Sequence, residues 1–185
     1  MKIIGMTGPS GSGKTCALKH LEQKGVKVID ADYMYHELLR HNLPMLDAIK
    51  ARFGITDRKQ LGEIVFADNK ALGELERITH PFVIDEIKYR LDTYRSLHVD
   101  MAAIEAIALF ESELASLCDG IILITADRDK LVDRITARDS VSREYAEARL
   151  NNRIFSNKAT FVIHNNGDIA NLYSQIDEIY TEVIL

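Results

Sequence analysis

The sequence predicts an α/β protein in which a five-stranded parallel sheet carries helices on both faces. Short apolar runs alternate along the chain with longer segments of helical periodicity. The short runs are continuously apolar or β-branched, as strands covered on both faces should be. The expected strands are Lys2–Thr7, Val26–Asp30, Ala103–Phe110, Gly120–Thr125 and Thr160–His164.

The segments between these strands have helical patterns. The first helix is expected over Lys14–Lys24 and ends near Gly25, a residue suited to a helix C-terminus. Asp127–Arg138 and Asp168–Ile184 each open with an acidic residue, which suits a helix N-terminus. The region Ala31–His98 is helical in pattern with no convincing strand. We therefore expect helical excursions after the second and fourth strands.

Composition excludes several classes of protein. The chain has 185 residues, which is the size of one domain, and its 46% hydrophobic content is that of a globular protein. Its net charge of −5 argues against broad nucleic-acid binding, and no apolar run approaches the ~20 residues needed to cross a membrane. The N-terminus is typical of a strand rather than a secretory signal. Two cysteines, Cys16 and Cys118, are too few for a disulfide scaffold, so we expect a cytoplasmic protein.

The segment Gly8–Thr15 fits the phosphate-loop pattern G-x-x-x-x-G-K-[ST], between an expected strand and an expected helix. Its glycines allow successive backbone N–H groups to converge on phosphate oxygens, and the helix that follows directs its positive end at the same anion. Lys14 supplies an ammonium group for the outer phosphates, and the Thr15 hydroxyl can ligate Mg²⁺. The pattern predicts binding of a nucleotide.

Two carboxylates, Asp30 and Asp32, close the second expected strand. A phosphoryl-transfer enzyme needs a carboxylate at such a strand end, to accept a hydroxyl proton or to hold Mg²⁺ through water. Alternatively, one of the two acids caps the helix that follows. We interpret Asp32 as the working carboxylate and Asp30 as structural or linked to the metal.

A second acidic position follows the third expected strand, at Glu111. This residue is either a carboxylate of the site or the first exposed residue of a loop. Glu105, inside the same apolar run, is either a paired core acid or a residue that precedes the true strand.

Seven short motifs occur together in one order along the chain, and in this the chain resembles the dephospho-CoA kinase family. Members of that family transfer the γ-phosphate of ATP to the 3′-hydroxyl of dephospho-CoA. The motifs that carry the resemblance are Gly8–Thr15, Val28–Asp32, Val65–Asp68, His80-Pro81, Leu109–Glu111, Arg138-Asp139 and Asn165–Gly167.

The resemblance implies a three-layer P-loop kinase fold that uses ATP and Mg²⁺. The core would be residues 1–30, 99–137 and 154–185, the acceptor-binding helical region 31–98 and the lid 138–153. Asp32 would be the catalytic base, with Lys14 and Arg138 neutralising developing charge. The acceptor would meet His36, His80 and Glu111, and Thr15 would ligate the metal. ATP would be bound by Gly8, Ser10, Gly11, Ser12, Gly13, Lys14, Thr15, Asn166 and Gly167.

Among the departures of the chain from the family pattern, two concern residues that would face the ligands. His36 stands where the family usually has an arginine, and Arg153 where it usually has glutamine. A neutral imidazole is a much poorer phosphate ligand than a guanidinium group. Two further hypotheses therefore stay open: a related kinase acting on a nucleoside or nucleotide, and a non-catalytic protein that binds ATP.

Two of the motifs also have purely structural interpretations. His80-Pro81 is typical of a helix start, with Thr79 as the cap and Pro81 in the first turn. The arginines near the end of the chain alternate with acids, which is typical of a solvated helical face with i,i+4 pairs. These arginines are Arg134, Arg138, Arg143, Arg149 and Arg153.

Overall fold

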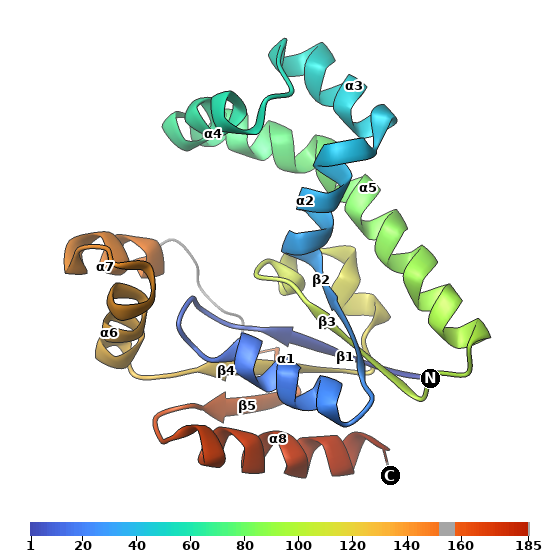
Figure 1. Cartoon of the computed structure of the whole chain (residues 1–185), viewed down its shortest axis with the longest axis vertical. Helices are drawn as coiled ribbons and strands as arrows, with labels where there is room; N and C mark the ends of the chain where they lie inside the picture. Colours follow the sequence, from blue (N-terminus) through green and yellow to red (C-terminus); the bar gives the residue numbers. More distant parts are fainter. Residues whose placement is uncertain (152–157, 185) are drawn as a thin grey trace. The chain divides into compact units, whose positions relative to one another are not determined.

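The protein is an α/β fold with a five-stranded, all-parallel sheet, as the sequence predicts (Figure 1). The structure is a computed structural model that describes residues 1–151 and 158–184. The strands lie in the order β2-β3-β1-β4-β5, which places β1 at the centre. They are β1 (Lys2–Thr7), β2 (Lys27–Asp30), β3 (Met101–Glu105), β4 (Gly120–Thr125) and β5 (Phe161–His164).

The chain divides into two compact units, and each is described here by itself. The first comprises Met1–Ile29 and Tyr94–Leu185, and the second comprises Asp30–Thr93. The functional division into core, acceptor-binding region and lid stays a prediction. The helices are α1 (Lys14–Gln23), α2 (Ala31–His41), α3 (Leu43–Phe53), α4 (Arg58–Ala67), α5 (Asn69–Ser96), α6 (Arg128–Asp139), α7 (Arg143–Asn151) and α8 (Ile169–Ile184), with short 3₁₀ turns η1 (Leu109–Glu111) and η2 (Glu113–Leu117).

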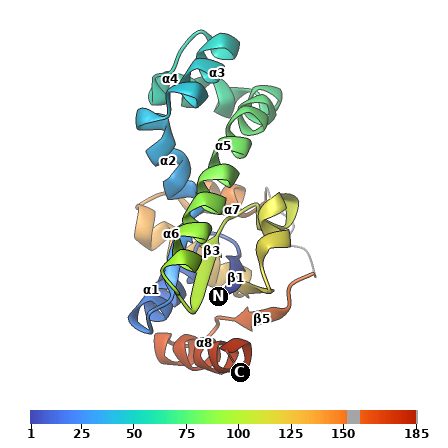
Figure 2. The same ribbon diagram turned by 90° about the vertical axis from the view of Figure 1, so that its right-hand side faces the viewer.

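The core of the first unit forms on both faces of the central strand. Ile4 and Met6 face α1 and α8, which pack together beside the sheet (Figures 1 and 2). Gly5 points to the opposite face, where a Cβ atom would lie 2.6 Å from a methyl carbon of Leu109. The alternation of a strand thus places one helical layer and the η1–η2 segment on opposite sides of β1. β1 and β4 have the predicted bounds.

The third strand is shorter than the sequence predicts, and the expectation Ala103–Phe110 was wrong. β3 ends at Glu105, and Glu111 belongs to η1. The apolar run continues beyond the strand because Leu109, which is fully buried, packs under Gly5 from a 3₁₀ turn. Apolar residues are equally hydrophobic in a buried strand and in a buried 3₁₀ turn. The length of the apolar run therefore overestimates the length of the strand.

In the second unit, each of the three helices α2, α3 and α4 begins at a residue whose side chain accepts a backbone N–H. Asp30 accepts from Tyr33, and Asn42 and Asp57 cap α3 and α4 in the same way. Asp30 therefore has the capping role that the sequence left open between the two acids.

The long helix α5 corrects the structural interpretation of His80-Pro81. Pro81 lies inside this helix rather than in its first turn, and the hydroxyl of Thr79 donates to the carbonyl of Leu75 at 2.9 Å. A proline inside a helix costs about 3 kcal/mol. A stripe of buried residues nevertheless continues across it, and burial of this stripe favours an unbroken helix. The stripe is Ala71, Leu75, Thr79, Val83, Ile87 and Leu91.

Among the helices within the described residues, none has both the length and the apolar character required to cross a bilayer.

A polar cluster joins α1 to α8 and predicts a pH-dependent contribution to stability. His20 stacks on Tyr173 with ring centroids 4.2 Å apart, and its Nε2 lies 2.6 Å from Asp177 Oδ1. The ammonium of Lys24 lies 3.1 Å from the same oxygen. Partial burial opposes ionisation of Asp177, but the hydrogen bonds from His20 and Lys24 prevail and hold its pKa below the ordinary value.

We expect Asp177→Asn to lower the free energy of unfolding by about 0.2–1 kcal/mol at pH 7. A carboxylate with a depressed pKa stabilises the fold above its unfolded pKa of about 3.9, and the contribution is lost as the pH falls through the folded value. Urea unfolding of both proteins between pH 7 and pH 3 measures this. A difference that stays constant over the whole range would assign the effect to packing instead.

Candidate active site

The phosphate loop Gly8–Thr15 connects β1 to α1 and has a backbone that glycine alone adopts without strain. A Cβ atom on Gly8 would lie 2.0 Å from the carbonyl oxygen of Ile124. Gly13, at the N-cap of α1, has φ +104°, and among the described residues no side chain caps this helix. A helix N-terminus without a capping side chain suits an anion.

Ser12 lies at the bottom of the loop and is fully buried. Its hydroxyl has no hydrogen-bond partner among the described residues. Its carbonyl accepts a hydrogen bond of 2.8 Å from the side chain of Asn165, which is itself buried and follows β5. The residue after β5 thus supports the loop, while the Ser12 hydroxyl stays buried without a partner among the described residues.

Lys14 folds back over its own loop. Its ammonium donates to the carbonyls of Gly8 at 2.9 Å and Pro9 at 3.2 Å, and lies 3.7 Å from Oε1 of Glu105. Glu105 ends β3 and is in register with Met6 of β1, two residues before Gly8. Glu105 is thus paired with the phosphate loop, a role that the sequence left unassigned. This contact could have been predicted from the sequence. Neighbouring parallel strands have their carboxyl ends at the same edge of the sheet, and Glu105 is the last residue of such a strand.

Two arginines of α6 also reach the loop. Arg134 donates to the carbonyl of Gly11 at 3.3 Å and to that of Asn165 at 3.0 Å. Arg138 donates to the hydroxyl of Ser10 at 3.2 Å. The interpretation of these arginines as a purely solvated face was therefore wrong for Arg134 and Arg138.

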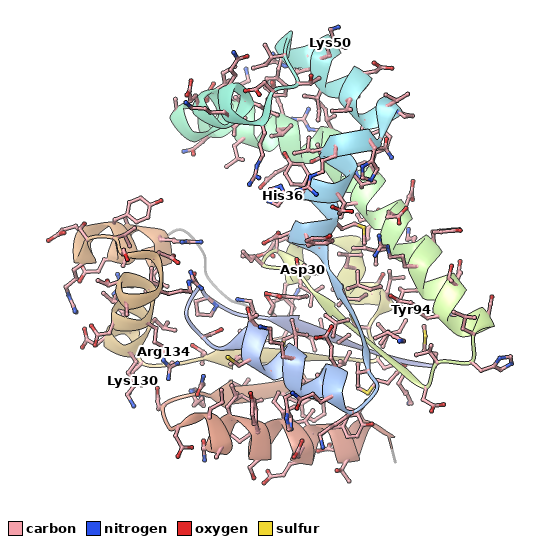
Figure 3. All side chains as sticks on the ribbon, viewed as in Figure 1. Asp30, His36, Lys50, Tyr94, Lys130 and Arg134 are labelled. Carbon is pink, nitrogen blue, oxygen red and sulfur yellow. The ribbon has the colours of Figure 1, made fainter. Side chains whose placement is uncertain are left out.

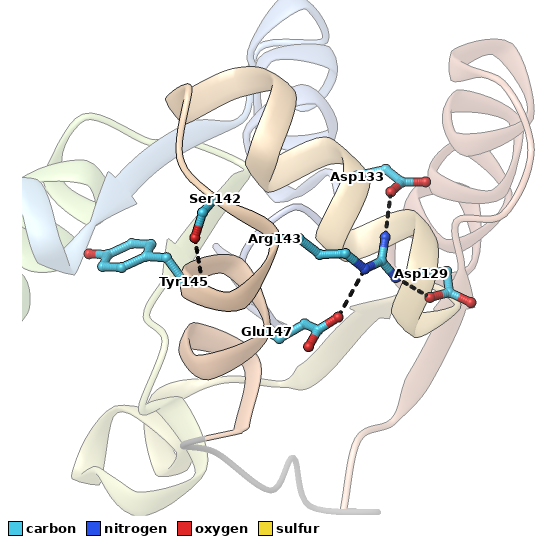
Figure 4. A network of polar contacts seen from close by, with 6 residues as sticks. All are labelled: Asp129, Asp133, Ser142, Arg143, Tyr145 and Glu147. Carbon is cyan, nitrogen blue, oxygen red and sulfur yellow. Dashed lines mark hydrogen bonds and ion pairs between the residues drawn. The ribbon is translucent and has the colours of Figure 1, made fainter.

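That interpretation is confirmed for Arg143, which lies on α7 and binds three carboxylates (Figure 4). The partners are Asp129 at 2.7 Å, Asp133 at 3.2 Å and Glu147 at 3.0 Å, the last at i,i+4 spacing. This network holds α7 on α6. Arg153 lies outside the described residues.

The Asn166-Gly167 turn after β5 is held to the start of α6. The side-chain amide of Asn166 accepts from the backbone N–H of Asp127 at 2.8 Å and donates to the carboxylate of Asp127 at 2.9 Å. The backbone carbonyl of Asn166 accepts a hydrogen bond from Lys130. Lys130 and Arg134, labelled in Figure 3, both project from α6. The contribution of Asn166 and Gly167 to nucleotide binding stays a prediction.

In the second unit, Asp32 and His36 lie on α2. Asp32 is exposed in the first turn. One turn on, His36 Nε2 lies 3.4 Å from a guanidinium nitrogen of Arg58, the first residue of α4. Burial and the charge of Arg58 lower the pKa of His36, although Asp32 opposes this. Although His36 stands where the family usually has an arginine, a guanidinium group is still present at this position, because Arg58 of α4 contacts His36.

The other two residues expected on the acceptor side are exposed. His80 lies on α5 in the second unit, and Glu111 lies in η1 of the first unit.

A phosphate loop between β1 and α1 of an all-parallel sheet, with basic side chains collected on it, defines a P-loop phosphotransferase. Within this class, the family model of dephospho-CoA kinase matches residues 2–171. The chain belongs to the dephospho-CoA kinase family, as the resemblance of its motifs implies, and it uses ATP to phosphorylate dephospho-CoA to CoA.

Relatives match over nearly the whole chain. A dephospho-CoA kinase from Geobacter sulfurreducens is 37% identical and the match covers 98% of both chains. A solved structure of dephospho-CoA kinase from Campylobacter jejuni has a TM-score of 0.70 at 27% identity and covers 99% of this chain and 98% of that one. A solved structure of a Thermus thermophilus protein has a TM-score of 0.81 at 28% identity, covering 98% and 97%.

Proposed function

We propose that the loop Gly8–Thr15 binds the phosphates of ATP and that the γ-phosphate goes to the 3′-hydroxyl of dephospho-CoA. The observation that carries this proposal is the set of cationic groups on one loop: Lys14, Arg134 and Arg138 all donate to its atoms. Carbonyl and hydroxyl oxygens are weaker acceptors than phosphate oxygens. Bound ATP therefore competes effectively for Lys14 and Arg138.

Lys14 and Arg138 would stabilise the phosphoryl group during transfer. Both are cations, and Lys14 is nearly buried, so its charge acts on a bound phosphate with less screening by water. Glu105 would receive the ammonium of Lys14 when the site is empty and retain an electrostatic contact with it when ATP binds.

The donor set near the loop fits Mg²⁺, which prefers hard oxygen ligands and keeps several waters. Thr15 is exposed in the first turn of α1, and we propose its hydroxyl as a direct ligand. Glu105 provides a carboxylate at the end of β3 and would hold the ion through water. When bound, Mg²⁺ would offset the charge of the β- and γ-phosphates.

We propose Asp32 as the base that orients and deprotonates the acceptor hydroxyl. Asp30 accepts the N–H of Tyr33 as the cap of α2, so Asp32 is not needed for capping. On the acceptor side we propose His36 and Arg58 together as a contact for the acceptor's phosphate groups, with His80 and Glu111 as further contacts. A guanidinium group binds phosphate through paired donors, and Arg58 supplies one beside His36.

We also propose that the protein works in the cytoplasm. Cys16 and Cys118 are free thiols, which suits a reducing compartment. Burial, with a smaller contribution from the charge of Asp119, raises the pKa of Cys118 to about 12, so this thiol stays neutral and unreactive.

Release of ADP in a coupled assay tests the acceptor. We expect turnover with dephospho-CoA and little with nucleosides, nucleoside monophosphates or no acceptor. Mass spectrometry of the product should place the added phosphate on the 3′-oxygen. Faster turnover with a nucleoside than with dephospho-CoA, or phosphate at another position, would contradict the proposal.

A further inference from the structure

Arg138 is held by its neighbour in the chain, Asp139, through two hydrogen bonds. Nε of Arg138 donates to Oδ1 of Asp139 at 2.6 Å, and Nη2 donates to Oδ2 at 2.8 Å. Paired donors on paired carboxylate oxygens fix the plane of a guanidinium group as well as its position. The orientation of Arg138 is therefore set by a carboxylate rather than by solvent.

Asp139 binds one edge of the Arg138 guanidinium group, and the other edge points elsewhere. A guanidinium has five N–H groups, which form two parallel pairs: Nε with Nη2 on the side, and Nη2 with Nη1 at the end. Asp139 takes the side pair. In the part of the chain that the structure describes, Nη1 makes no hydrogen bond, while the other N–H of Nη2 donates to the hydroxyl of Ser10 in the phosphate loop. The end pair therefore faces the loop: its Nη2 N–H contacts Ser10, and among the described residues its Nη1 has no partner.

Asp139 is in turn held in place by α7. Arg149 donates to Oδ2 of Asp139 at 2.9 Å. Helix α7 packs on α6 through a small core of Val132, Ile135 and Ala146. Hydrogen bonds, first from Arg138 and then from Arg149, hold the pKa of Asp139 below its ordinary value, so it is a carboxylate at neutral pH and accepts only.

We propose that Asp139 is a positioning residue for phosphoryl transfer: it turns Arg138 so that the end pair of the guanidinium exchanges its contact with Ser10 for phosphate oxygens of the nucleotide in the loop. This rests on the role proposed above for Arg138. The phosphate then takes two parallel N–H donors that were already aimed at the loop, which lowers the cost of ordering the side chain during transfer.

The test compares Asp139→Asn with Asp133→Asn in steady-state ADP-release assays and thermal unfolding. Asp133 lies on the same helix and also binds an arginine, Arg143, but among the described residues that arginine makes no hydrogen bond to the loop. We expect Asp139→Asn to lower kcat about tenfold with KM for ATP little changed. Its unfolding midpoint should match that of Asp133→Asn, which should keep wild-type turnover.

Arg138→Ala and the double variant Arg138→Ala/Asp139→Asn separate the possible outcomes. If Asp139 acts through Arg138, the double variant is no slower than Arg138→Ala alone. The proposal is overturned if the losses of kcat in the two single variants multiply in the double variant. It is also overturned if Asp139→Asn has wild-type kcat while Arg138→Ala is impaired. Wild-type kcat in Arg138→Ala itself would instead show that the role assigned to Arg138 is wrong.

Discussion

Replacing Asp32 by asparagine is expected to lower kcat by about 10²–10⁴ while leaving the affinity for ATP unchanged. Asparagine has nearly the shape of aspartate but cannot accept the proton of the attacking hydroxyl. The phosphate loop is unaltered, so ATP still meets Lys14 and the N-terminus of α1. Steady-state ADP release with dephospho-CoA measures kcat, and calorimetric titration with ATP measures the affinity.

Asp30→Asn is the matched control for this prediction. Asp30 lies two positions earlier and caps α2 through its hydrogen bond from Tyr33. Asparagine caps helices as well as aspartate does, so this variant removes one charge and keeps the fold. Its kcat should fall far less than that of Asp32→Asn. Normal turnover in Asp32→Asn, or an equal loss in both variants, would contradict the assignment of the base to Asp32.

The parts of the fold that follow from local patterns could be predicted from the sequence. β1 and β4 are continuous apolar runs that end at polar residues or glycines, and both have the predicted bounds. The phosphate loop is equally local, because all its residues lie within one short segment. β3 was harder, since the apolar residues after Glu105 are buried in a turn rather than in the sheet.

The contacts around the loop could not be predicted in the same way, because they join distant parts of the chain. Arg134 and Gly11 are 123 positions apart, and Arg138 and Ser10 are 128 apart. In the sequence, Arg134, Arg138 and Arg143 all have acidic residues nearby along α6 and α7. In the structure, Arg134 and Arg138 donate to the phosphate loop, whereas Arg143 binds three carboxylates. Tertiary packing decides between these outcomes.

Gly8→Ala is expected to lower the free energy of unfolding by about 2–4 kcal/mol and to abolish measurable ATP binding. The new methyl carbon would lie 2.0 Å from the carbonyl oxygen of Ile124, far inside contact distance, and φ at this position is +151°. The neighbouring atom belongs to the backbone of β4, so relief requires the loop or the strand to move. Either movement displaces the N–H groups that would surround the phosphates.

Gly73→Ala is the matched control, since it adds the same methyl group inside helix α5. Apart from its chain neighbours and the backbone of its own helix, no described residue has a heavy atom within 4 Å of the added carbon, and alanine favours a helix over glycine. This variant should be more stable than the wild type by about 0.5–1 kcal/mol and should bind ATP normally. Urea unfolding followed by circular dichroism, together with calorimetric titration of ATP, measures both variants. If Gly8→Ala binds ATP with wild-type affinity, the loop accommodates a side chain at this position. The close packing of Gly8 against β4 is then not required for the phosphate site.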